Sequence, residues 1–260
     1  YFVEALGVPG GAGAGVTAGP VVLVTSTAAA VGALLVFSAY RDGPYAFPRR
    51  RFTWDHARVV VRSRKWRLAT GGYLGHMWEL YAMWTWVAAF LAASAEASNA
   101  AADVPGLLVR AAPALAIAAG GAGCIWGGRV ADRIGYEALT IRAMAVSGVC
   151  ALTIGFLFGG PFPIVLGVAL LWGFFVVADS AQFSAAVTEV VPSHVVGTAL
   201  TLQVSLGFLL TMVTIQLVPL LQSTLGWRWA FPVLAFGPLA GIISMARLRA
   251  RRSADVGPTG

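Results

Sequence analysis

Long apolar stretches alternate with short polar segments along almost the whole chain. Seven stretches reach about the 20 residues that a helix needs to cross a hydrocarbon layer of roughly 30 Å. They comprise residues 20–40, 68–93, 105–127, 138–158, 162–187, 197–221 and 229–247. Proline, glycine and charged residues separate them, as is typical of turns at a membrane surface. The alternating strands of a transmembrane barrel are not found. The pattern predicts an all-α, polytopic transmembrane helix bundle of about seven spans.

The composition supports this fold class. The chain is 58% hydrophobic and 11% charged, whereas soluble domains have about 45–50% apolar and about 25% charged residues. A soluble fold of 260 residues could not bury this much apolar surface, so we expect the lipid bilayer to be a main partner. The two cysteines lack the spacing of a metal site or a disulfide framework, and we expect no cofactor.

The positive charges predict how the chain is oriented. Sixteen of the eighteen basic residues fall in three places: segment 41–67, residues 129–142 around the turn after the stretch 105–127, and residues 247–252 from the end of the last stretch into the tail. Seven alternating spans place these segments on one side, which the positive-inside rule makes cytoplasmic, together with the C-terminus. Basic residues divided among membrane loops do not form a nucleic-acid site, so we expect no nucleic-acid partner. The abundance of Ala, Gly and Arg favours a bacterial inner membrane.

A motif between the third and fourth stretches gives the chain a family resemblance. The sequence GRVADRIG at 128–135 resembles the signature loop of the major facilitator superfamily, Gly-x-Leu-Ala-Asp-Arg-x-Gly. By this resemblance, the conformational-switch loop would contain Gly128, Asp132, Arg133 and Gly135. We expect Gly128 to allow close helix contact, Asp132 to face a helix N-terminus and Gly135 to permit a tight turn.

The resemblance also implies which part of a transporter this chain represents. The long basic loop resembles the family's central linker, and VPSHVVGTALTLQ at 191–203 resembles the loop between helices ten and eleven. The basic pair that often follows the signature motif is replaced by Tyr136 and Glu137. The implied domains are the end of the N-terminal half (1–40), a basic cytoplasmic central loop (41–67), a C-terminal six-helix domain (68–247) and a cytoplasmic tail (248–260). Helices one to five would be missing, and we expect the N-terminal half to come from the same or a separate chain.

Two acidic residues lie inside apolar stretches. Glu79 and Asp179 occupy the stretches 68–93 and 162–187, which the resemblance makes the first helices of two inverted three-helix repeats, lining a central cavity. Insertion of an ionised carboxylate at the bilayer centre costs about 2.5–3.5 kcal/mol. We therefore expect both side chains to face water, a partner or a substrate.

Aromatic and polar residues share the helix faces of these acids. His76 is three residues from Glu79 and lies on the same face, and both faces combine aromatic with polar groups, as small-molecule sites do. We expect the substrate or proton pathway to include His76, Glu79, Trp172, Asp179, Gln182 and Gln203. The implied function is secondary active transport of a neutral, cationic or amphipathic small molecule by alternating access, as a symporter or antiporter coupled to protons.

Other interpretations of the same residues remain open. His76 and Glu79 could bond each other, or groups of the missing half, and hold helices together, and Asp179 could be a buried hydrogen-bond hub with Ser180 or Gln182. A non-transporting membrane sensor or scaffold is the alternative function, with an intramembrane enzyme less favoured. We expect no enzymatic activity, because H-E-x-x-H, G-x-S-x-G and P-loop motifs are absent. In the central loop, residues 54–66 predict either a helix on the membrane surface or a solvated linker.

Overall fold

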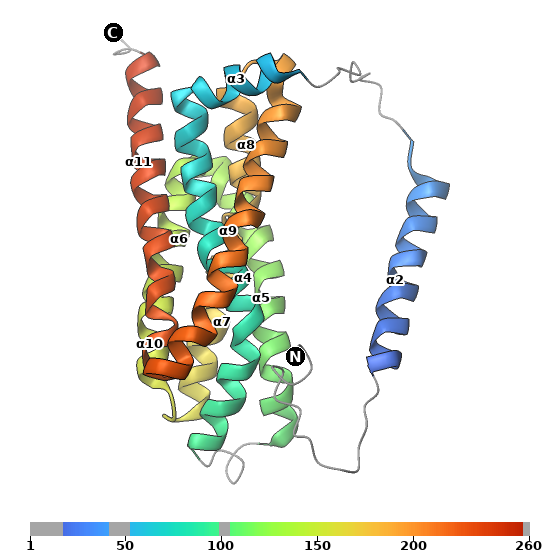
Figure 1. Ribbon diagram of the computed structural model, residues 1–260, viewed down its shortest axis with the longest axis vertical. Coiled ribbons are helices and arrows are strands. Elements are labelled where there is room, and N and C mark those ends of the chain that lie inside the picture. Colours follow the sequence, from blue (N-terminus) through green and yellow to red (C-terminus); the bar gives the residue numbers. More distant parts are fainter. Residues whose placement is uncertain (1–17, 42–52, 99–104, 257–260) are drawn as a thin grey trace. The chain divides into compact units, whose positions relative to one another are not determined.

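The computed structural model of the protein is helical throughout the part that it describes (Figure 1). That part comprises residues 18–41, 53–98 and 105–256. No strand is found within these ranges, so the predicted all-α class is confirmed for them. Two compact units are present, Tyr1–Arg51 and Phe52–Gly260. Residues 42–52 of the predicted central loop lie outside the described residues.

The first unit contains one described helix, α2 (Ala18–Ala39). Its 22 residues include no charged side chain and are apolar around the whole helix, which is typical of a helix surrounded by lipid. The helix coincides with the predicted stretch 20–40. The composition and length of α2 therefore agree with a membrane segment.

The second unit is built from long helices joined by short turns. Its α-helices are α3 (Trp54–Arg62), α4 (Arg64–Ala97), α5 (Gly106–Ile134), α6 (Tyr136–Ile154), α7 (Phe162–Ala178), α8 (Ser180–Val190), α9 (Val196–Leu225), α10 (Trp227–Ala230) and α11 (Phe236–Val256). The segments long and apolar enough to cross a membrane are Gly106–Ile134, Tyr136–Leu157, Phe162–Val190, Ser193–Leu225 and Trp227–Asp255. These five segments indicate an integral membrane protein with a helical bundle.

Helix α4 is long enough to cross a membrane but is less apolar than these five. It has 34 residues, and it runs beside the other long helices along the bundle (Figure 1). Its mean hydropathy is lowered by His76, Glu79 and several tryptophans and tyrosines. Two of these residues, His76 and Glu79, are predicted site residues, and Arg64, Lys65 and Arg67 at the start of the helix lower its hydropathy further. We treat α4 as the sixth long helix of the bundle.

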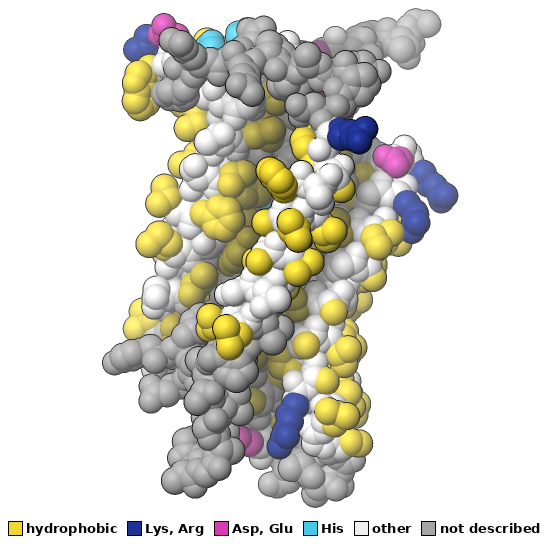
Figure 2. Space-filling view, turned by 90° about the vertical axis from the view of Figure 1, so that its right-hand side faces the viewer, with side chains coloured by type: hydrophobic (Ala, Val, Ile, Leu, Met, Phe, Trp, Pro, Cys, Tyr) yellow, Lys and Arg dark blue, Asp and Glu magenta, His cyan; other side chains and the backbone are white. Residues whose placement is uncertain are grey.

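The outer surface carries large apolar side chains. Met212 and Leu209 on α9 are 67% and 62% exposed, and Phe236 on α11 is 66% exposed. Figure 2 shows hydrophobic side chains along the middle of the helices, with the Lys, Arg, Asp and Glu side chains toward the helix ends. Exposed apolar area on this scale is stable when lipid covers it.

The six long helices pack as two related groups of three. Helix α4 packs against α9 and α11, and α7 packs in the corresponding way against α5 and α6. Helices α6 and α11 contact each other. If α4 is exchanged with α7, α5 with α9 and α6 with α11, the contact of α4 with α9 becomes that of α7 with α5. The contact of α4 with α11 likewise becomes that of α7 with α6. Helices α4 and α7 run in opposite directions (Figure 1), so this exchange of contacts agrees with the two inverted three-helix repeats that the sequence predicts.

Small residues allow the closest helix contacts. A Cβ atom added to Gly173 of α7 would collide with the backbone carbonyl of Ala116 on α5, and one added to Gly127 would collide with that of Ala178. In the α4–α11 contact, Gly75 and Gly237 each face the other's carbonyl oxygen. Close backbone approach at small residues is how membrane helices gain packing energy.

The signature motif differs from its predicted form. Residues 128–134 are not a loop but the last turns of α5, and Gly135, with φ of 85°, makes the turn into α6 as predicted. The predicted close helix contact at Gly128 is wrong for the described residues, because an added Cβ would meet no atom within 4 Å. Gly127 makes that contact instead, because it is the neighbour that faces α7–α8. Asp132 is exposed and forms no ion pair with a described residue.

Helix α3 lies across the end of the bundle where α4 begins and α11 ends (Figure 1). Thr53 caps it by accepting a hydrogen bond from the backbone N–H of His56. Val60 is buried, and Trp54 is 81% exposed. The helical alternative is thus correct for residues 54–62, whereas Trp66 belongs to α4. We call this end of the unit the basic end, because it holds the arginines of α4 and α11 and, from α5, Arg129 and Arg133.

Candidate functional site

Glu79 is one of two acids that the described bundle encloses almost completely, the other being Asp179. Glu79 lies near the middle of α4, and its side chain is 1% exposed. Trp172 Nε1 on α7 donates a hydrogen bond of 2.6 Å to Oε1, and Ser147 Oγ on α6 donates one of 2.9 Å to Oε2. Each carboxyl oxygen thus has one donor, and the side chain connects three helices. No basic side chain within the described ranges contacts Glu79.

His76 lies one helical turn before Glu79 and connects α4 to the break between α7 and α8. Its Nδ1 is 2.9 Å from Oδ1 of Asp179, and its Nε2 is 3.2 Å from Oγ of Ser180. Both members of the His76–Asp179 pair are at most 3% exposed. Phe183 packs against the imidazole with ring centroids 5.2 Å apart. We call the residues His76, Glu79, Ser147, Trp172, Asp179 and Ser180 the interior cluster.

The interior cluster includes a helix break that the apolar pattern did not predict. The stretch 162–187 was predicted as one span, and Phe162–Val190 is one span, but it is interrupted at Asp179, between the end of α7 at Ala178 and the start of α8 at Ser180. Aspartate and serine side chains compete for backbone hydrogen bonds and are unfavourable in helix interiors. The break places the carboxylate of Asp179 and the hydroxyl of Ser180 beside opposite nitrogens of one imidazole ring.

The remaining predicted residues are buried but do not all join the cluster. Trp172 is fully buried and is a donor in it. Gln182 is 8% exposed. Gln203 on α9 is fully buried, and neither of its amide atoms has a hydrogen-bond partner among the described residues. The structure therefore brings together four of the six predicted residues, His76, Glu79, Trp172 and Asp179.

The contacts decide between the alternatives for individual side chains. Glu79 and His76 have separate partners and do not bond each other. Asp179 is buried and its charged neighbour is His76, not Gln182, but the 2.9 Å approach lacks hydrogen-bond geometry, and Oδ1 of Asp179 has no hydrogen-bond partner among the described residues. In this conformation the two acids are enclosed by protein and do not line an open cavity.

Sequence reasoning missed Ser147 as a partner of Glu79. It is an isolated hydroxyl in the middle of an apolar stretch, and such a residue, 68 positions away, could be linked to Glu79 only through the packing of α6 on α4. Ser180 was considered only as a bonding partner of Asp179. Its position directly after an intramembrane aspartate was the available signal.

The Asp179–His76–Ser180 arrangement can hold or relay a proton. A carboxylate at Nδ1 favours the tautomer with its proton on that nitrogen, and Nε2 then accepts a hydrogen bond from the serine hydroxyl. The same three groups occur in acyl-transfer triads, where oxyanion donors and substrate access are also required. No group of three or more His, Cys, Asp or Glu that could hold a metal occurs among the residues described.

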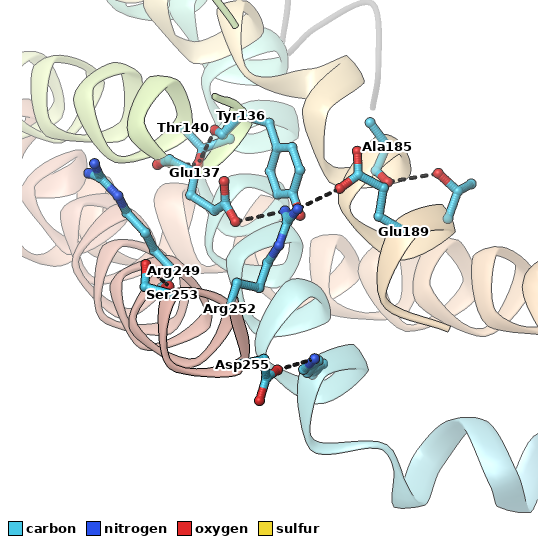
Figure 3. A network of polar contacts seen from close by, with 11 residues as sticks. Tyr136, Glu137, Thr140, Ala185, Glu189, Arg249, Arg252, Ser253 and Asp255 are labelled. Carbon is cyan, nitrogen blue, oxygen red and sulfur yellow. Dashed lines mark hydrogen bonds and ion pairs between the residues drawn. The ribbon is translucent and has the colours of Figure 1, made fainter. Parts of the chain in front are cut away.

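A second polar network lies at the basic end (Figure 3). Arg252 of α11 contacts Glu137 through Nη1 and Glu189 through Nη2, both at 2.9 Å. Its guanidinium group lies over the ring of Tyr136 at 4.8 Å. The network connects the start of α6, the end of α8 and the end of α11, and Glu137 stands where the family motif often has a basic residue. We call Tyr136, Glu137, Glu189 and Arg252 the basic-end network.

Comparison of the sequence with protein-family models and with curated proteins finds no match.

Proposed function

We propose that the chain is the C-terminal portion of a secondary active transporter of the major facilitator type, which moves a small solute by alternating access. The observation that carries the proposal is the contact of His76 with Asp179. It joins the first helices of two inverted repeats in the interior of a membrane bundle. Transporters with inverted repeats hold their substrate and coupling-ion sites where such repeats meet, often beside broken helices.

The interior cluster supplies groups suited to proton coupling. Imidazole and carboxyl groups exchange protons, and ionisable residues inside membranes mark ion or substrate pathways by default. A change in the contact between α4 and the α7–α8 break alters the surroundings of His76 and Asp179 together. The protonation of this pair is thereby coupled to the relative position of the repeats, which is the requirement for ion-driven alternating access.

Glu79 is the proposed substrate or proton residue next to this pair. In the enclosed conformation Trp172 and Ser147 occupy both of its oxygens. A substrate cation or water that reaches Glu79 must replace one of these donors. The aromatic surroundings and the acids suit a neutral, cationic or amphipathic solute.

A second six-helix unit is the proposed partner. Of the 18 most apolar consecutive residues in the α5 span and in the α9 span, only 22% are buried. The corresponding share in the Phe162–Val190 span is 50%. These two helices are equivalent under the exchange of the repeats, so the least covered surfaces are related by the same symmetry. A carrier of this type encloses its substrate between two such units, and we propose that the second unit comes from the same or another polypeptide.

Proton movement in proteoliposomes tests the proposal. Vesicles that contain the protein and a pH-sensitive dye are exposed to a panel of amino acids, sugars and organic cations, with and without a pH gradient. We expect at least one solute to move protons, and Glu79→Gln to abolish the coupled signal. Glu96→Gln is the matched control, because Glu96 is an exposed acid on the same helix, next to the C-terminal end of α4. Equal coupled transport in both variants would exclude Glu79 from the mechanism.

One observation favours a second candidate, a non-transporting membrane module. The interior acids already have protein partners, as expected of residues that only hold helices together. For such a module, the substitution at Glu79 would lower stability, and no solute in the panel would move protons. The measurement that distinguishes the two candidates is therefore solute-driven proton flux, and not the stability of the Glu79 variant.

A further inference from the structure

Four arginines surround a hollow of about 700 Å³ at the basic end of the six-helix unit. Its lining consists of Arg64, Arg67, Leu68, Arg247, Ala250 and Arg251. The first three belong to the beginning of α4 and the others to the end of α11. The volume is in the range of small-ligand sites, about 300–1,000 Å³. We call this hollow the arginine pocket.

The packing of α4 against α11 explains why the hollow opens at this level. Deeper in the bundle, Gly71 and Gly72 allow close contact, since a Cβ on either would collide with Ser244 or Met245. One to two turns closer to the basic end, long arginine side chains stand on both helices in place of these glycines. The hollow lies between these side chains.

Acids balance the positive charge of the pocket only in part: Asp255 lies close enough to Arg251 for their charges to attract, but its ion-pair partner is Lys65. None of its four arginines forms an ion pair with an acid in the described part of the chain. The nearby acids pair with other basic residues. Asp255 pairs with Lys65, and the two glutamates of the basic-end network pair with Arg252. Guanidinium groups bind phosphate oxygens in a bidentate manner, so a phosphate group is the complementary ligand.

An apolar path on α11 leads into the pocket. Leu239, Ile243, Arg247 and Arg251 follow at four-residue steps, so each contacts the next along a strip that winds slowly around the helix. Leu239 is 55% exposed and Ile243 is 44% exposed. A ligand with a phosphate and acyl chains can place the phosphate among the arginines and its chains along Leu239 and Ile243. A free phosphate would contact the arginines alone.

We propose that the arginine pocket binds the headgroup of an anionic phospholipid at the membrane surface. Basic pockets between transmembrane helices on the cytoplasmic side are suited to such headgroups. The site is separate from the interior cluster, and its occupancy does not depend on the transport proposal. A bound headgroup would bridge the outermost turns of α4 and α11, the first and last of the long helices of the unit.

Native mass spectrometry of the whole purified chain, titrated with phosphatidylglycerol in detergent, tests the site. We expect R247Q/R251Q to weaken binding about 30-fold, from the contribution of two arginines near a lipid phosphate. R64Q/R67Q removes the charges of the other helix and should cause a similar loss. The control is R142Q/R249Q, which removes the same charge from exposed arginines outside the pocket and should change binding less than threefold.

Three outcomes would overturn the proposal. An equal loss in the control would show general attraction to a basic surface. Equal binding of phosphatidylcholine would show that the arginines do not select the ligand. Displacement of phosphatidylglycerol by millimolar inorganic phosphate would identify a free phosphate, not a lipid, as the ligand. Each variant is first checked for helicity and a single chromatographic peak, and two pocket variants on different helices keep the test valid if one does not fold.

Discussion

The interior cluster and the basic-end network hold acidic side chains in contrasting ways. Glu79 and Asp179 are 1% exposed, and their partners are a tryptophan, a serine and a histidine. Glu137 and Glu189 share one arginine at the bundle end, and Glu189 is half exposed. Both networks join three or more helices. The interior network must compensate buried charge without solvent, whereas water and salt can replace contacts at the end.

This contrast indicates different roles for similar residues. An acid that contacts solvent can lose its partner at small cost, because water hydrates the free carboxylate. An acid inside the bundle cannot, so any motion that separates it from its partner must supply another. The interior cluster is therefore suited to a conformational step controlled by a ligand or proton, and the basic-end network is suited to fastening helix ends.

The largest effect should follow from His76→Ala. This change leaves the buried carboxylate of Asp179 without the imidazole beside it, and a buried carboxylate left without its partner costs about 3–5 kcal/mol. The free energy of unfolding can be measured by detergent titration followed by circular dichroism. His194→Ala, in an exposed turn, is the control and should stay within about 0.5 kcal/mol. A similar value for both histidines would remove the proposed difference between the regions.

A smaller loss is expected for Trp172→Phe. The change keeps most of the aromatic ring but removes the donor to Oε1 of Glu79, and a buried acceptor without a partner costs about 1–3 kcal/mol. The same titration measures the loss. Trp126→Phe on the surface of α5, where Trp126 is 39% exposed, should have little effect. An unchanged stability for Trp172→Phe would indicate that Glu79 has another donor, such as water.

The parts of the fold that were predictable are those set by the length of the apolar stretches in the sequence. The stretches 105–127 and 197–221 correspond to α5 and α9, because membrane helices must satisfy their backbone internally and remain apolar over about 20 residues. The break at Asp179 was not predicted, since a hydropathy average over a span does not register one polar dipeptide. The close contact at Gly127, one position before the motif's Gly128, depends on the rotation of α5 about its axis.

The candidate site was predictable in its acids and not in its contacts. Glu79, His76 and Asp179 stand out because ionisable groups are costly in a membrane. Their enclosure was not predictable, because it depends on Ser147 and Trp172 from two other helices. Gln203 was also singled out, but its amide has no partner among the described residues, so its place in a pathway stays a prediction.

Arg252→Gln should cost less than either interior change. The contacts to Glu137 and Glu189 are partly exposed to solvent, so we expect a loss of about 1 kcal/mol or less. The loss should shrink between low salt and 1 M salt, where the Debye length falls to about 3 Å. The effect of His76→Ala should not change with salt. Equal salt dependence of the two variants would show that the interior cluster is accessible to ions.

Ser180→Ala tests the smallest contribution and the enzyme alternative together. Ser180 is only partly buried, and its contact to Nε2 of His76 is 3.2 Å, so its removal should cost about 0.5–1 kcal/mol. If the serine only orients the imidazole, the wild-type protein should not react with a fluorophosphonate probe, because an oriented hydroxyl without oxyanion donors is a weak nucleophile. Labelling of the wild type that disappears in Ser180→Ala would instead make the interior cluster a hydrolytic site, and the comparison with the basic-end network would then concern catalysis and not conformational coupling.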